Sequence, residues 1–116
     1  MPVITVGRLG NPENAEKVLQ EGRADMVSMG RALLADPYIA NKARSGRARE
    51  IRPCIACNEC VGRLFHGWRI ACSVNPLMSK EYKKKIEQTR HPKKVIVVGA
   101  GPARLEAARV SGAERA

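Results

Sequence analysis

Aromatic side chains are scarce in this sequence. Its 116 residues include one Trp, two Tyr and one Phe, which together make up 3% of the chain. A hydrophobic core must therefore be built from aliphatic side chains. The shortage also argues against nucleic acid as a partner, because single strands are bound largely by stacking bases on aromatic rings.

Long hydrophobic runs are absent as well. No stretch approaches the roughly 20 apolar residues that a membrane-spanning helix requires, so we expect no membrane partner. Residues 1–7 show no basic region leading into a long apolar stretch, as a secretory signal peptide would. We therefore expect a cytoplasmic, reducing environment, in which disulfides between the four cysteines would not persist.

Acidic residues are few beside the basic ones. The chain has 11 Asp and Glu against 21 Lys and Arg, which gives a formal net charge of +10. The basic excess begins just before the cysteines and continues past them. A solvated surface would explain it, and so would bound anions such as flavin phosphates or a negatively charged metal cluster.

The first half of the chain shows an alternation of strand and helix patterns. Short apolar runs over 2–6 and 24–29 predict buried strands. Asn or Asp followed by Pro predicts a helix start in each following segment, giving helices over 11–22 and 36–46. This order predicts parallel α/β architecture, although two such units do not close a sheet. Further along, the sequence predicts a polar helix over 79–88.

All four cysteines lie within nineteen residues, with the spacing C-x2-C-x2-C-x11-C: Cys54, Cys57, Cys60 and Cys72. Zinc sites usually pair two C-x2-C units across a long gap. Here three cysteines lie in one tight loop and the fourth lies apart, which suits three corners of a [4Fe–4S] cubane and a remote ligand for the fourth. The spacing therefore favours an iron–sulfur cluster, with zinc and an inert role as the alternatives.

The segments around these cysteines resemble a known family. Residues 52–60 (RPCIACNEC) and 70–76 (IACSVNP) resemble the iron–sulfur segment of the NADH:flavin oxidoreductases, the multidomain relatives of old yellow enzyme that include 2,4-dienoyl-CoA reductase and trimethylamine dehydrogenase. Residues 6–9 (VGRL) and 29–37 (MGRALLADP) resemble the ends of that family's last two barrel strands. The two-residue gap between Cys57 and Cys60 is similar to the trimethylamine dehydrogenase branch.

The resemblance implies a division of the chain. It would contain the last two βα units of an FMN-binding (β/α)8 barrel, an irregular [4Fe–4S] loop, a basic linker and the first βα unit of a Rossmann-like domain that binds FAD or NAD(P)H. The corresponding ranges are 1–52, 53–78, 79–92 and 93–116. Phe65 and Trp68 would cover the cluster with apolar surface, and His66 is expected to be structural.

Two glycine–arginine pairs follow the predicted strands of the barrel segment. In such barrels the loops after the last two strands bind phosphate through backbone N–H groups. The resemblance implies that Gly7, Arg8, Gly30 and Arg31 hold the phosphate of FMN. Judged from the sequence alone, Gly30 could equally be a strand-end turn and Arg31 a solvated residue of the first helical turn.

A glycine-rich turn follows the β-branched run Val95–Val98, which predicts a strand. Gly99 and Gly101 match the first two glycines of a dinucleotide fingerprint, whereas Arg104 stands where the third glycine is expected. A second nucleotide at this turn is therefore one interpretation, and a plain βα unit is the other.

The function implied by the resemblance is that of an oxidoreductase. The parent enzyme would use NAD(P)H to reduce an enoate or dienoyl-CoA, or would oxidise an amine, and would pass electrons between FMN and the second nucleotide site through the cluster. No catalytic residue can be named in this chain, and we expect it to be inactive alone, with the rest of the barrel or a second copy as partner. The alternatives are a small iron–sulfur electron-transfer protein and a basic zinc module that contacts nucleic acid.

Overall fold

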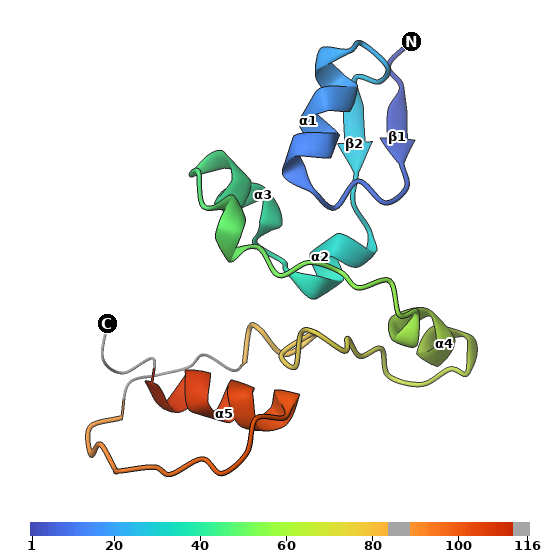
Figure 1. The fold of residues 1–116 in the computed structure, drawn as a ribbon. Helices are drawn as coiled ribbons and strands as arrows, with labels where there is room; N and C mark the ends of the chain where they lie inside the picture. Colours follow the sequence, from blue (N-terminus) through green and yellow to red (C-terminus); the bar gives the residue numbers. More distant parts are fainter. Residues whose placement is uncertain (84–88, 113–116) are drawn as a thin grey trace. The chain divides into compact units, whose positions relative to one another are not determined.

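The computed structural model describes residues 1–83 and 89–112 (Figure 1). The chain divides into two compact units, Met1–Glu81 and Tyr82–Ala116, which are described separately. The first unit contains two strands, four α-helices and one short 3-10 helix, and the described part of the second contains one helix.

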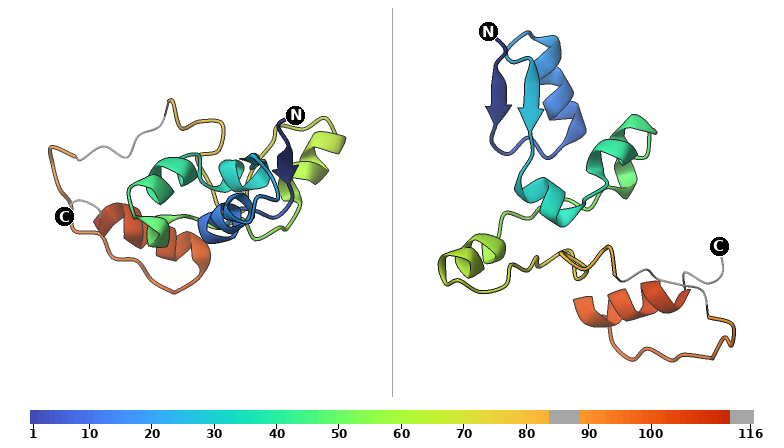
Figure 2. Two further views of the ribbon diagram at one scale, coloured as in Figure 1. Left: turned by 90° about the horizontal axis from the view of Figure 1, so that it is seen from above. Right: turned by 180° about the vertical axis from the view of Figure 1, so that it is seen from behind.

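The first unit begins with a β-α-β arrangement. Strands β1 (Ile4–Val6) and β2 (Met26–Ser28) pair in parallel, with Thr5 opposite Val27. Helix α1 (Pro12–Gln20) connects them and packs beside β2 (Figures 1 and 2). This confirms the predicted parallel α/β architecture for the start of the chain.

Helix α1 begins as the sequence predicts. The side chain of Asn11 accepts a hydrogen bond of 2.8 Å from the backbone N–H of Glu13, and Pro12 occupies the first helical position. The helix ends before Gly22, which adopts a left-handed conformation with φ +65°.

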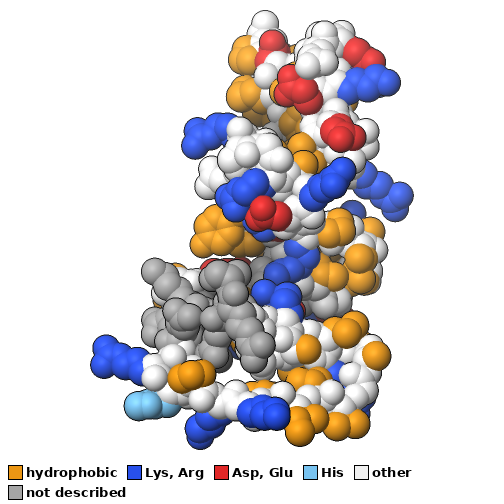
Figure 3. Space-filling model, turned by 60° about the vertical axis from the view of Figure 1, so that its left-hand side comes forward, with side chains coloured by type: hydrophobic (Ala, Val, Ile, Leu, Met, Phe, Trp, Pro, Cys, Tyr) orange, Lys and Arg blue, Asp and Glu red, His pale blue; other side chains and the backbone are white. Residues whose placement is uncertain are grey.

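The prediction that both strands are buried is wrong. Val6 is 72% exposed and Ile4 59% exposed, and Met26 is exposed too. The side chains of a strand alternate between the two faces of the sheet. Helix α1 is the helix that packs against this pair, so strand side chains that do not face α1 stay exposed. Figure 3 shows hydrophobic side chains at the molecular surface among lysines and arginines.

The segment after β2 forms two short helices, of which the sequence analysis predicted only the second, as a helix over 36–46. Helix α2 (Arg31–Ala35) follows β2 directly, and α3 (Ile39–Arg44) starts after Tyr38. Proline disfavours helical backbone in the residue before it, and Asp36, which precedes Pro37, is accordingly extended with φ −141° and ψ 99°. Asp36 therefore ends one helix and does not cap the next.

The cysteine segment contains a helix that the sequence analysis did not predict. After the short 3-10 helix η1 (Ala48–Glu50), the chain runs without regular structure to α4 (Glu59–Phe65), which includes Cys60. The predicted helix over 79–88 is wrong for residues 79–83, which form turns, and residues 84–88 lie outside the described part.

The second unit contains helix α5 (Pro102–Gly112), which follows the glycine-rich turn. Residues 95–98 do not form the predicted strand. A strand is defined by hydrogen bonds to a neighbour, and the described part of this unit has no strand to pair with them. None of the described helices combines the length and the apolar character needed to cross a membrane.

Candidate metal centre

All four cysteines line a single pocket in the first unit. Its other lining residues come from α2 and from the segments around the cysteines: Arg31, Leu34, Ile55, Asn58, Ser73 and Val74. The thiols are free, with Cys54 and Cys57 exposed and Cys60 and Cys72 half-buried. The structure thus brings together four residues that span nineteen positions, while their role as ligands stays a prediction.

Left-handed backbone shapes the loop that carries the first three cysteines. Ala56 and Asn58 have φ values of +55° and +59°, a conformation that non-glycine residues seldom adopt. The chain consequently turns twice between Cys54 and Cys60, with Cys57 between the two turns. The backbone N–H of Ala56 donates to Cys54 Sγ at 3.4 Å, which makes the thiol of Cys54 an acceptor inside this turn.

The pKa of the Cys57 thiol lies below its usual range. Its Sγ lies 3.2 Å from the hydroxyl of Ser73, and this hydrogen bond lowers the pKa of Cys57 below its usual range, with a smaller contribution from the backbone N–H of Glu59. Metal ligation requires the thiolate, so a lowered pKa is compatible with the predicted role of Cys57 as a metal ligand.

Four thiols are a donor set that can bind an iron–sulfur cluster or a single zinc ion. A tetrahedral zinc ion with bonds of about 2.3 Å would hold its sulfur ligands within about 4 Å of one another. Among the described residues, no group of three or more His, Cys, Asp or Glu side chains is gathered closely enough to hold one ion. In an iron–sulfur cubane each cysteine binds a different iron, which keeps the thiolates farther apart.

A buried carboxylate, which the sequence analysis treated only as a helix cap, anchors the chain before the first cysteine. Asp36 is 3% exposed. Its Oδ2 accepts a 2.6 Å hydrogen bond from Lys42 Nζ and one of 2.9 Å from the backbone N–H of Arg52, while its Oδ1 accepts from Tyr38 N. Burial raises the pKa of Asp36, but the hydrogen bonds from Lys42, Arg52 and Tyr38 outweigh it and lower the pKa overall.

A buried amide anchors the chain after the last cysteine. Asn75 is 2% exposed, and its amide group donates to the backbone carbonyl of Leu34 and to Glu81 Oε1, both at 2.9 Å. Its Oδ1 accepts from Arg52 Nη1 at 3.2 Å and from the backbone N–H of Leu77 at 3.1 Å. All of its hydrogen-bonding capacity is used, so Asn75 ties both ends of the cysteine segment to α2.

The two glycine–arginine pairs lie at the carboxyl ends of β1 and β2, which are parallel, so both pairs lie at the same edge of the sheet. The loop after β1 also approaches α2 closely, since a Cβ atom added at Gly10 would lie 2.9 Å from Cβ of Ala32. Gly7 and Arg8 both have positive φ, as a tight turn after a strand requires. The sequence analysis had not singled out Gly10.

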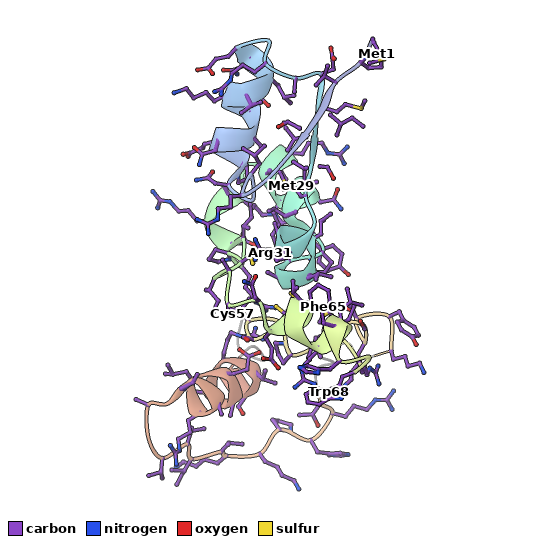
Figure 4. All side chains as sticks on the ribbon, turned by 90° about the vertical axis from the view of Figure 1, so that its right-hand side faces the viewer. Met1, Met29, Arg31, Cys57, Phe65 and Trp68 are labelled. Atoms are coloured by element: carbon purple, nitrogen blue, oxygen red, sulfur yellow. The ribbon has the colours of Figure 1, made fainter. Side chains whose placement is uncertain are left out.

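Arg31 points toward the cysteines. It lines the cysteine pocket, and its Nη1 donates a hydrogen bond to Oδ1 of Asn58. In Figure 4 Arg31 and Cys57 lie near each other, where the start of α2 meets the cysteine segment.

The aromatic residues do not cover the pocket, contrary to our expectation. Phe65 is 84% exposed and Trp68 62% exposed, and neither lines the pocket (Figure 4). Leu34, Ile55 and Val74 provide its apolar wall instead. The ring of His66 stacks on Trp68 with a centroid distance of 4.9 Å.

In the second unit, the side chain of Arg104 lies close to the turn formed by Gly99 and Gly101. Gly99 has φ +103°, and a Cβ atom added there would lie 2.7 Å from Cδ of Arg104. Nη1 of the same arginine lies 3.7 Å from the corresponding point at Gly101. The side chain of Arg104 therefore lies over the turn on which a dinucleotide phosphate would rest.

Comparison with known proteins identifies the type of protein. Residues 1–50 match the sequence model of the NADH:flavin oxidoreductase / NADH oxidase family. Residues 1–50 therefore carry a segment of this family. The resemblance is thereby confirmed for the strand ends over 6–9 and 29–37, and the match ends before the cysteine segment.

Similar proteins match the chain over nearly its whole length. It is 50% identical to an NADH oxidase of Thermoanaerobacter brockii over 99% of the chain and 18% of the relative. It is 45% identical to a metal reductase of Desulforamulus reducens, over 96% of the chain and 17% of the relative. The structure of histamine dehydrogenase from Rhizobium sp. 4-9 superposes with a TM-score of 0.90 at 32% identity, covering 98% of this chain and 17% of that one. The chain thus spans less than a fifth of the length of these relatives.

Proposed function

We propose that this chain is the part of a flavin and iron–sulfur oxidoreductase that holds the cluster and contributes to the FMN phosphate site. One observation carries the proposal: all four cysteines line one pocket in the segment that follows the family-matched residues 1–50. The names of the matched proteins, an NADH oxidase, a metal reductase and a dehydrogenase, support redox chemistry as the general activity.

In this proposal the four cysteines are the cluster ligands. The hydroxyl of Ser73 lies within hydrogen-bond distance of Cys57 Sγ, while the buried groups of Asp36 and Asn75 hold the two ends of the segment in place. A bound [4Fe–4S] cluster would supply single-electron transfer between a flavin and a second redox partner.

The proposed flavin contacts are the two pairs at the sheet edge. Backbone N–H groups after β1 and β2, with the side chains of Arg8 and Arg31, would bind the phosphate end of FMN. Gly99 and Gly101 would belong to a second nucleotide site for FAD or NAD(P)H, and Arg104 would have to leave the glycine turn before a phosphate could lie there. The NAD(P)H-dependent reduction of an unsaturated substrate, or the oxidation of an amine, would take place in the whole protein.

Anaerobic reconstitution tests this proposal. Iron, sulfide, zinc and flavin are quantified together on the purified chain, and the absorption spectrum is recorded before and after reduction. We expect about four irons and four sulfides per chain and a broad band near roughly 400 nm that bleaches on reduction. Recovery of one zinc per chain without iron would overturn the proposal and support a zinc module.

A further inference from the structure

Arg31 occupies an unusual position among the pocket residues. It carries the only charged side chain among those that line the pocket, apart from any cysteines that ionise. It comes from the first position of α2, directly after β2, and not from the cysteine segment itself. A guanidinium stays protonated at any pH at which the protein is folded, so this wall of the pocket carries a permanent positive charge.

The partner of Arg31 is the residue that shapes the cysteine loop. Asn58 lies between Cys57 and Cys60 in a left-handed conformation, and its backbone carbonyl accepts a 2.8 Å hydrogen bond from Gly62 N, in the first turn of α4. Its side chain makes no capping bond to this helix and is used by Arg31 instead. Fixing the Asn58 side chain therefore fixes the turn that sets Cys57 and Cys60 relative to each other.

The positive charge of Arg31 has a second consequence, which concerns the reduction potential of a bound cluster. Four thiolates give the pocket a strong negative charge, and reduction of a cluster adds one more electron to it. A nearby positive charge stabilises the more negative state, so it raises the reduction potential. One arginine can thus both order the cysteine loop and favour the reduced cluster.

We propose that Arg31 is a positioning and tuning residue for the iron–sulfur cluster, in addition to any contact with a flavin phosphate. Its guanidinium holds Asn58 and thereby the loop from Cys57 to Cys60, and its charge raises the potential of the bound cluster. This inference rests on the proposed function, because it requires that the pocket binds a cluster.

The test compares five variants with the reconstituted wild-type chain: Arg31→Met, Arg31→Lys, Arg44→Met, Asn58→Ala and the double variant of Arg31→Met with Asn58→Ala. Arg31→Met removes both the charge and the hydrogen bond to Asn58. Arg31→Lys keeps the charge but lacks the planar guanidinium that reaches Asn58. Arg44→Met removes an exposed arginine from α3, outside the pocket, as the matched control for charge. The measurements are the reduction potential from a redox titration followed by electron paramagnetic resonance, and the rate of iron loss to a chelator.

Distinct results are expected for each variant. Arg31→Met should lower the potential and speed iron loss by about tenfold, the lower end of the range seen when groups that orient metal ligands are removed. Arg31→Lys should keep the potential close to that of the wild type but lose iron faster, and Arg44→Met should match the wild type in both measurements. Asn58→Ala should speed iron loss as much as Arg31→Met, with no further effect in the double variant.

The outcomes separate this inference from the proposed function. A wild-type chain that binds no cluster under anaerobic reconstitution overturns both. A wild-type chain that binds a cluster, together with an Arg31→Met variant of unchanged potential and unchanged iron loss, overturns the role of Arg31 alone. Additive effects of Arg31→Met and Asn58→Ala on iron loss would show that Arg31 does not act through Asn58.

Discussion

Individual side chains decide how the cysteine pocket is built. The sequence identified the four thiols, but it did not show that Asp36 and Asn75 hold the chain on either side of them. Both are buried polar residues whose hydrogen bonds connect segments 16 to 41 positions apart in the chain. Leaving such a group unpaired in the interior is costly, so each should matter more to stability than an exposed residue of the same type.

Cys72 gives the first prediction at this scale. It lies twelve residues beyond Cys60, but it lines the same pocket. Cys72→Ala should therefore bind less iron and lose most of the absorption near roughly 400 nm, because each corner of the cubane needs a thiolate. Iron content and the visible spectrum check this, with Ser111→Ala as a control in the other unit. A variant that keeps the full iron content would show that Cys72 is not a ligand.

Asp36 gives a prediction about pH. Its pKa is lower in the folded chain than the ordinary value of 3.8, so it contributes stability that is fully present above that value. This contribution is lost as the pH falls through the folded pKa. The free energy of unfolding should therefore fall below about pH 4, and Asp36→Asn should lower it by about 2 kcal/mol at pH 7.

Urea unfolding between pH 3 and pH 7, followed by circular dichroism, measures this effect. The exposed variant Glu16→Gln serves as the control and should change the stability by less than about 0.5 kcal/mol. If Asp36→Asn has the same stability and pH dependence as the wild type, the buried ion pair with Lys42 does not stabilise the chain.

At the scale of elements, the sequence predicted the ends of a helix correctly where those ends depend on neighbouring residues. Asn11, Pro12 and Gly22 start and end α1 as predicted, because capping depends on residues within one turn. Helix α3 lies within the helix predicted over 36–46 from Asp36 and Pro37, whereas α2, which ends before Asp36, was missed. Helix α4 was missed because its start depends on the left-handed Asn58, a conformation that no residue pattern in this segment indicated.

The close approach of the loop after β1 to α2 leads to a prediction about Gly10. Gly10→Ala places a methyl group 2.9 Å from Cβ of Ala32, so the loop or the helix must shift. We expect a loss of stability of about 1–3 kcal/mol and weaker binding of FMN, because the proposed phosphate loops move apart. Gly62→Ala is the matched control, since nothing lies within 4 Å of its added Cβ and alanine favours the interior of α4. Equal stability of both variants would contradict the close packing.

At the scale of the whole molecule, large apolar side chains remain at the surface. Val6, Met26 and Leu64 in the first unit and Ile96 and Val98 in the second are all exposed. The hydrophobic effect favours covering such surface. The rest of a barrel or a second copy of the chain would therefore be a suitable partner for it.

Self-association is the prediction that follows. The purified chain should form dimers or larger species whose fraction rises with concentration, as measured by sedimentation velocity. Val6→Lys, at the exposed end of β1, should reduce association, and Leu105→Lys would show whether the second unit contributes. A chain that stays monomeric at every concentration measured would contradict this prediction.

Flavin binding should be weak in the isolated chain. The candidate residues bind only the phosphate end of FMN, through a few charge-assisted hydrogen bonds worth about 1.5–3 kcal/mol each, and this gain is largely offset by the entropy lost on binding. We expect a dissociation constant from about 100 μM to several millimolar, and no oxidation of NADH. Fluorescence titration with FMN and an NADH absorbance assay measure both quantities. Submicromolar binding with turnover would show that the chain alone forms a flavin site.

The sequence by itself determined the chemistry that is available and the family. Cysteine spacing, the two glycine–arginine pairs and the capped helix α1 are local patterns, and each depends on residues close together in the chain. Only the tertiary structure decided what surrounds the cysteines: Arg31 from α2, the apolar side chains of Leu34, Ile55 and Val74, and the anchors Asp36 and Asn75. It also placed Phe65 and Trp68 away from the pocket. Such contacts join residues distant in sequence, and they form through packing and the pairing of buried polar groups, which no short pattern encodes.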